Sequence, residues 1–257
     1  MLAKCTEDRM TAHLTIDRDI IFQRARGILN ISAVSVADDQ SLLRDLRQQG
    51  SYRAIFPRPV QGTVEAVIIN TAGGVTGGDN FSTTITANAN AKISVTTQAA
   101  ERIYCAPDLT VGSMQARLYA KRDAQLYWLP QETILFEGSR LRRRLDVEVA
   151  QGAKFLMVEP LVFGRKASGE ILQSCSLDDS VCITCEGSPI YVDRIKLNGD
   201  IASILKRSAV ANGACAMASV VLVDPMAKTM LEGVRALLPT AAGASLLADD
   251  TLVIRLL

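Results

Sequence analysis

A strand–turn–strand pattern with a central alanine occurs three times in this 257-residue chain and constrains its fold more than any other feature. In each copy an apolar–polar alternation leads into a polar turn, an alanine follows, and a second alternating stretch comes after it. The alanines are Ala91, Ala124 and Ala153, at intervals of 33 and 29 residues. Such a period is typical of units that stack on one another. The pattern predicts a mainly β protein, with stacked units in a β-helix-like or layered body; three unrelated hairpins are the alternative.

We expect one domain over residues 1–257, with a β-rich body at about 14–197 and a smaller α/β segment at about 198–257. In the smaller segment, apolar residues at three- and four-residue steps predict two helices, and continuous apolar runs predict two strands. The second helix has a candidate N-terminal cap in Asp224-Pro225 and ends before Pro239. The predicted elements are helices at 201–207 and about 225–238, and strands at 214–223 and 251–257.

Four glycines lie within the segment Asn70–Asp79, which follows the apolar run Val64–Ile69. Such a density of glycine indicates positive φ angles or a close backbone approach. A phosphate-binding P-loop has a lysine after its last glycine, whereas Asp79 stands at that position and its carboxylate would repel phosphate. The residues that follow, Phe81–Thr86, alternate as a strand instead of opening a helix. The favoured interpretation of the segment is therefore a glycine-rich β-connection. The alternative is that Asp79 offers a hard oxygen ligand for a metal ion.

The charge balance excludes several classes of partner. The formal net charge is +1, which favours neither nucleic acid nor an anionic membrane as a partner. The chain has no apolar run long enough for a transmembrane helix, and its first residues are too charged for a signal peptide. We therefore expect a soluble, cytoplasmic protein.

The cysteines and the single histidine favour neither a metal centre nor a catalytic triad. Cys182 and Cys185 are the only close pair among six cysteines, and strand alternation places their thiols on opposite faces. Buried, reduced thiols are the favoured interpretation. His13 is the only histidine, so no histidine-based triad can be built within one chain.

Acidic residues supply the candidate metal ligands. Glu132 and Glu159 each follow the second strand of a repeat unit, so stacking would bring them near one another along one side. Asp79 follows the glycines, and Glu170 closes the segment Gly164–Glu170. Carboxylates in a row suit a hard or passing divalent cation. Solvated carboxylates at strand ends are the alternative for each of them.

The run Arg140–Glu148 alternates charged and apolar residues, with Arg142 and Arg144 opposite Leu141 and Leu145. An edge strand protected by its charges is the favoured interpretation. A docking surface for an acidic partner comes second. A nucleic-acid patch is disfavoured, because the net charge is neutral and aromatic residues are not interleaved.

Several of these segments resemble the urease accessory protein D family, called H in some systems. The resemblance covers roughly residues 20–200 in sequence order, and its motifs are long. The motifs that carry it are Arg24–Gly27, Phe56–Pro59, Asn70–Asp79, Thr96–Tyr104, Trp128–Ser139, Arg142–Val147 and Gly164–Glu170.

The resemblance implies a scaffold in nickel-centre assembly and not an enzyme. Members of the family bind apo-urease and the accessory protein F, and through F they recruit the GTPase accessory protein G, which carries nickel. The resemblance also implies a β-rich body with a small helical part. It implies transient Ni²⁺ and no tightly bound cofactor. Glu170 is the position most readily assigned to the nickel path, ahead of Asp79, Glu132 and Glu159.

Three functional hypotheses follow. The first is a nickel-delivery scaffold with an apolar, partner-facing surface and a tendency to aggregate alone; the mean hydropathy of +0.17 agrees with such a surface. The second is a protein-interaction module with no role in moving metal. The third is a carboxylate-dependent enzyme on a β-solenoid, such as a glycoside-active protein. Only 5% of the residues are aromatic, which weighs against a sugar-binding surface.

Overall fold

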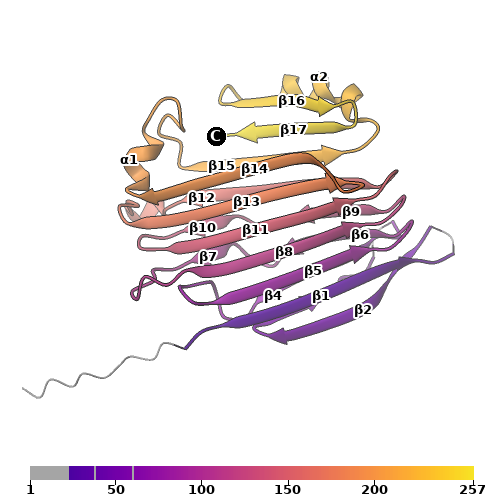
Figure 1. Ribbon diagram of the computed structural model, residues 1–257, viewed down its shortest axis with the longest axis horizontal. Coiled ribbons are helices and arrows are strands. Elements are labelled where there is room, and N and C mark those ends of the chain that lie inside the picture. Colours follow the sequence, from indigo (N-terminus) through magenta and orange to yellow (C-terminus); the bar gives the residue numbers. More distant parts are fainter. Residues whose placement is uncertain (1–22, 38, 60) are drawn as a thin grey trace, which may run out of the picture.

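The computed structural model describes residues 23–37, 39–59 and 61–257. Within these residues, two β-sheets face each other, and the chain passes repeatedly from one to the other. Figure 1 shows the strands stacked in one direction, from β2 at one end to β16 and β17 at the other, with α2 beyond them. No helix in this described part is long and apolar enough to cross a membrane. This arrangement of stacked strands in two sheets confirms the predicted mainly β, stacked fold.

The seven-stranded sheet has a parallel centre and antiparallel edges. Strands β1, β5, β8, β11 and β13 run parallel to their neighbours, while β2 and β14 close the two edges as antiparallel partners. In spatial order its strands are β14 (Ser188–Gly199), β13 (Cys175–Cys185), β11 (Arg140–Val149), β8 (Gly112–Ala120), β5 (Asn80–Ala87), β1 (Arg26–Ser35) and β2 (Ser41–Gly50).

The ten-stranded sheet follows the same plan. Strands β4, β6, β9 and β12 are parallel, and antiparallel strands flank them on both sides. Two short strands, β7 (Glu101–Ile103) and β10 (Thr133–Leu135), belong to this sheet beside its main path, where β10 pairs with both β12 and β7. The main path runs β16 (Ala242–Ala248), β17 (Thr251–Leu256), β15 (Ala216–Val223), β12 (Lys154–Phe163), β9 (Gln125–Leu129), β6 (Lys92–Thr97), β4 (Val64–Asn70) and β3 (Tyr52–Ile55).

The sequence repeat is the stacking register of this body. Ile93 lies beside Leu126, and Leu126 lies beside Phe155, which are the same 33- and 29-residue steps that separate the three alanines. The backbone N–H of Gln125 donates to the carbonyl of Ala91, and that of Lys154 donates to the carbonyl of Ala124. Alanine fits these turns because its side chain is almost fully buried between neighbouring units: Ala91 and Ala124 are 0% exposed and Ala153 is 5% exposed. The hairpins are therefore not independent.

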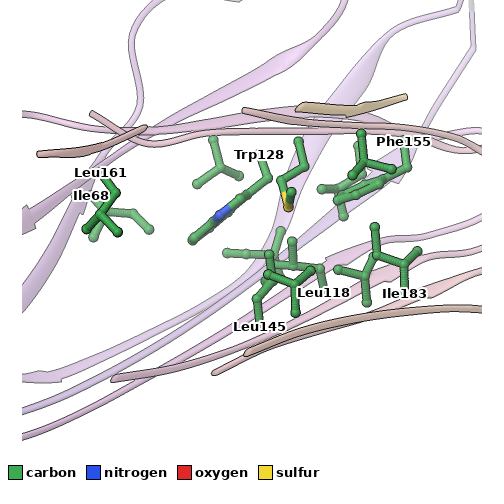
Figure 2. Close-up of a cluster of buried hydrophobic side chains, with 14 of the residues drawn as sticks. Ile68, Leu118, Trp128, Leu145, Phe155, Leu161 and Ile183 are labelled. Atoms are coloured by element: carbon green, nitrogen blue, oxygen red, sulfur yellow. The ribbon is translucent and has the colours of Figure 1, made fainter. Parts of the chain in front are cut away.

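The core lies between the two sheets, because every second residue of each strand points inward. Figure 2 shows Trp128, Phe155 and Leu161 of the ten-stranded sheet on one side and Leu118, Leu145 and Ile183 of the seven-stranded sheet on the other. Most of these side chains are under 4% exposed. Burial of large apolar side chains contributes roughly 1.5–3 kcal/mol each, so this layer is the main source of stability.

The C-terminal segment extends the ten-stranded sheet. The predicted strands are β15 and β17, and the predicted helices are α1 (Ile201–Leu205) and α2 (Ala227–Leu237). The predicted cap at Asp224 is wrong, because the N-cap of α2 is Met226 and makes no side-chain cap bond. The Asp224 carboxylate accepts the backbone N–H of Met226 at 2.8 Å, in the turn that precedes the helix. The structure adds β16, which the sequence did not predict, and α2 packs on β16 and β17. A single-turn 3-10 helix, η1 (Lys166–Ser168), follows β12.

The prediction that Arg140–Glu148 forms an edge strand is wrong. These residues lie in β11, which pairs with β8 on one side and β13 on the other. Charged residues occur in a central strand because one face of this sheet is open to water, and Arg142 and Arg144 point outward as predicted. Arg143 points the other way, on the same face as the buried Leu141 and Leu145. It therefore brings a charge into the interior.

The five described cysteines are free thiols, as expected, but only Cys175 is buried. Cys105 is exposed, because it lies in a loop outside the strands, and Cys182, Cys185 and Cys215 are half-buried. Cys5 and His13 lie outside the described residues.

Candidate functional site: an ionisable cavity between the sheets

A cavity of about 350 Å³ interrupts the apolar core between the two sheets. Both sheets contribute to its wall. Its lining includes hydrogen-bonding and ionisable groups that are rare in a β core: Tyr52, Glu101, Trp128, Thr133, Arg143 and Glu159. Polar groups buried in this way are costly unless they are paired or carry a function.

Arg143 is the centre of a buried ion cluster at one end of the cavity. Its Nε and Nη2 atoms donate to the two carboxylate oxygens of Asp179 at 2.9 and 2.6 Å. Nη2 also lies 3.1 Å from Oε2 of Glu159, and Nη1 donates to the hydroxyl of Thr133 at 3.1 Å. The carboxylates of Asp179 and Glu159 raise the pKa of Arg143 against the opposing effect of burial, so the guanidinium is charged.

Glu159 is held from two sides. The indole N–H of Trp128 donates to its Oε1 at 2.9 Å, while Oε2 faces Arg143. Burial raises the pKa of Glu159, and the Arg143 charge acts against that rise. The cluster therefore holds two carboxylates around one guanidinium, away from bulk water.

Glu101 marks another part of the same cavity and was not among the predicted site residues. The side-chain amide of Asn70 donates to its Oε1 at 3.0 Å. Burial raises the pKa of Glu101 to about 7. Burial, and then the Glu101 carboxylate, raise the pKa of the Tyr52 phenol. One sequence feature could have identified Glu101, which is its position inside the long family-like motif Thr96–Tyr104. Within that motif, however, Glu101 is not marked by a preceding glycine or proline.

The carboxylate of Asp79 accepts hydrogen bonds from the backbone. It is 4% exposed, and its two oxygens accept the N–H groups of Ala25 and Thr76 at 2.7 and 2.9 Å. These bonds join the start of the first strand to the glycine-rich connection between β4 and β5. Both oxygens are thus occupied, and Asp79 does not line the cavity.

Close packing requires three of the four glycines of that connection, Gly74, Gly77 and Gly78. A Cβ atom on Gly74 would lie 2.4 Å from the Tyr104 ring and 2.6 Å from the carbonyl of Arg102. Gly74 also has a φ of +154°, which L side chains rarely adopt. The next residue, Val75, is fully buried and bridges to Ile103. The segment is therefore a β-connection, as favoured from the sequence.

Glu170 holds together the loop that follows β12, through hydrogen bonds to Arg165 and Glu137. Its carboxylate accepts from the side chain and the backbone N–H of Arg165, and from the backbone N–H of Glu137. Bonding to Arg165 lowers the pKa of Glu170 to about 2. Like Asp79, it holds the chain that surrounds it.

The four predicted ligands are not gathered into one site. Only Glu159 lines the cavity; Glu132 is half-buried next to the lining residues Gln131 and Thr133. The repeat units that contain Glu132 and Glu159 do stack on one another as predicted. Thr133, the residue after Glu132, pairs with Leu161, which lies two positions after Glu159. Across the described residues, no three histidine, cysteine, aspartate or glutamate side chains converge as a ready metal site. Their role in a nickel path stays a prediction.

Large apolar side chains are exposed at the two ends of the stack. At one end, Leu42, Leu43 and Leu46 lie on the edge strand β2. At the other, Met226 and Met230 are 53% and 46% exposed at α2, and Leu237 is 86% exposed. Exposed apolar clusters of this kind favour contact with another protein.

Comparisons with known proteins agree with the resemblance seen in the motifs. The family model described as UreD urease accessory protein matches residues 25–257. A protein of Ruegeria pomeroyi named urease accessory protein UreD is 48% identical over 217 residues, which cover 84% of each chain. Proteins of the same name from Roseobacter denitrificans and Rhizobium etli are 43% and 40% identical, covering 91% of this chain and 85% of theirs. The chain belongs to the UreD urease accessory protein family.

Proposed function

We propose that this protein acts in urease maturation as a non-catalytic scaffold that bridges apo-urease and the accessory F and G proteins. In this proposal it also passes nickel towards the urease metallocentre, and Ni²⁺ is its cargo and not a resident cofactor. Membership of the UreD family supports a role in urease maturation. The bridging and the passage of nickel rest on the features described next.

The observation that carries the proposal is the ionisable cavity inside an otherwise apolar body. A purely mechanical scaffold gains stability from apolar packing and has no need for buried carboxylates, which cost free energy to desolvate. Carboxylate and amide carbonyl oxygens are suitable transient ligands for a divalent cation. Glu101 and Glu159 both line this cavity.

The exposed apolar side chains at opposite ends of the stack support the bridging role. Two separated apolar surfaces allow two partners to bind one chain at the same time, with the cavity between them. Such surfaces also promote aggregation when the partners are absent.

The test uses a matched pair of isosteric substitutions in the complete maturation system. Glu159→Gln removes the carboxylate from the cavity wall, whereas Glu148→Gln alters an outward-facing carboxylate on β11 that is 50% exposed. Each variant is co-expressed with urease and the accessory F and G proteins. Co-purification of the complex, urease activity and bound nickel are measured.

We expect both variants to form the complex, and only Glu159→Gln to lower the nickel content and activity of urease. Full activation by Glu159→Gln would favour the interaction-module hypothesis and exclude a metal path through Glu159. If the unmodified chain fails to co-purify with either the F protein or apo-urease, the scaffold role is wrong.

A further inference from the structure

A second, very small space lies directly behind the ion cluster. Its volume is about 10 Å³, close to the least that can hold one water molecule. Arg143 and Glu159 line both this space and the large cavity, so the pair forms the wall that separates them. Asp179, Asp193 and Ser219 line the far side.

The wall joins the two sheets. Arg143 comes from the seven-stranded sheet, Glu159 from the ten-stranded sheet and Thr133 from the short strand β10. The side chains of Asp179 and Glu159 are each 6% exposed. Moving the single guanidinium would therefore remove every link between these groups at once.

Polar groups continue on the other side of the wall. Asp193 of β14 pairs with Arg255 of β17, and the Tyr191 hydroxyl donates to the same carboxylate at 3.2 Å. In the ladder of the ten-stranded sheet, Glu159 lies beside Ser219, and Ser219 lies beside Arg255. Ionisable groups thus extend from the large cavity through the wall to the last strands of the stack.

The position of Arg143 is unfavourable for a cation that follows this line. A fixed guanidinium at the wall repels a divalent ion, and it occupies carboxylate oxygens that the ion needs as ligands. When both carboxylates are ionised, one guanidinium leaves one of their two negative charges unmatched. The site can therefore accept more positive charge if the guanidinium moves away.

We propose that Arg143 is a displaceable plug: it separates the two spaces, and when it moves away it leaves Asp179 and Glu159 to a divalent cation. This inference rests on the proposed function and adds a residue that controls passage. A purely structural cross-link would have the same resting contacts. The two roles differ in what nickel does after the guanidinium is removed.

The chain contains its own reporter for this experiment. Trp128 is the single tryptophan, and its indole N–H bonds Glu159 at the wall. Nickel that reaches Glu159 therefore quenches the only tryptophan fluorescence of the protein. The purified full-length chain is titrated with NiCl₂, and the fluorescence of Trp128 is followed together with equilibrium dialysis of the metal.

The key variant is Arg143→Gln, and Arg142→Gln, on the outward face of the same strand, is its matched control. We expect Arg143→Gln to bind one Ni²⁺ about tenfold more tightly than the wild type, with stronger quenching, because a repelling charge is gone. Arg142→Gln should match the wild type. The double variant Arg143→Gln/Asp179→Asn should lose most of the gain, because it lacks the second carboxylate.

If Arg143→Gln does not fold, Arg143→Lys decides, because lysine keeps the charge but cannot form the two parallel bonds to Asp179. It should bind nickel more tightly than the wild type but less tightly than Arg143→Gln, because the carboxylate oxygens are released while the repelling charge remains. A folded Arg143 variant with wild-type nickel affinity and quenching overturns the plug. That outcome, together with a loss of urease activation in Glu159→Gln, would overturn the plug alone. Tight binding by Arg143→Gln with full activation by Glu159→Gln would instead overturn the proposed nickel path.

Discussion

Replacing Asp79 by asparagine separates a structural carboxylate from a metal-binding one. The native side chain accepts two backbone N–H groups, one from each of two segments far apart in the sequence. Asparagine keeps one carbonyl oxygen, but its NH₂ group then faces an N–H that has lost its acceptor. Asp79 is 4% exposed, so water cannot readily replace the lost bond.

The cost can be worked out from these contacts. A hydrogen bond to a charged group contributes about 1.5–3 kcal/mol, and an unpaired buried donor adds a penalty of similar size. Because one of the two bonds survives in weakened form, we expect Asp79→Asn to lower the free energy of unfolding by roughly 2–4 kcal/mol. For a chain of this size that loss corresponds to roughly 5–15 °C in Tm.

The assay is thermal and urea unfolding of the purified chain, followed by circular dichroism without added metal. Asp45→Asn is the control, because Asp45 is 73% exposed and its ion pair with Arg44 lies on the surface; its effect should stay within about 0.5 kcal/mol. If Asp79→Asn were as stable as this control yet failed to support nickel loading of urease, the structural role argued for Asp79 would be refuted. A place for it on the nickel path would then be favoured.

Three further predictions concern the repeat and the titrating carboxylates. Ala124→Val overfills a fully buried turn and should cost about 1–3 kcal/mol of unfolding free energy, whereas Ala89→Val in the exposed part of a turn should cost little. The pKa of Glu101 is raised from 4.5 to about 7, so the folded state holds this proton more tightly than the unfolded state. The contribution of Glu101 to stability is then largest below pH 4.5 and falls by about 3 kcal/mol as the pH rises to 7; Glu101→Gln should flatten this slope in urea-unfolding experiments. The pKa of Glu170 is lowered to about 2, so its contribution is present above pH 4.5 and lost as the pH falls towards 2. Glu170→Gln should lack this contribution already at neutral pH in thermal unfolding.

The repeat could be predicted from the sequence because its signal is local and recurs at a regular interval. An alanine at the same place in each turn and the alternation of the flanking strands both reflect one physical requirement, the close stacking of units. The C-terminal helices and strands were visible for the same reason. β16 was missed because Ala242–Ala248 is short, mostly outward-facing and weakly alternating.

The sheet position of β11 and the content of the cavity depend on contacts between distant residues. Charges on one face of a strand suit both an edge and the open face of a central strand, so Arg142 and Arg144 could not distinguish them. Arg143 meets Asp179 only because β11 and β13 align 36 residues apart, and it meets Glu159 only across the space between the sheets. No local pattern marks such a meeting.

The stacking of units also makes the interior modular in length. Neighbouring strands lie about 4.8 Å apart, and each unit of 29 or 33 residues adds one strand to each sheet. Inserting or removing a whole unit would lengthen or shorten the body by that one step and leave its cross-section unchanged. A chain built in this way sets the separation of whatever binds its two ends in discrete increments.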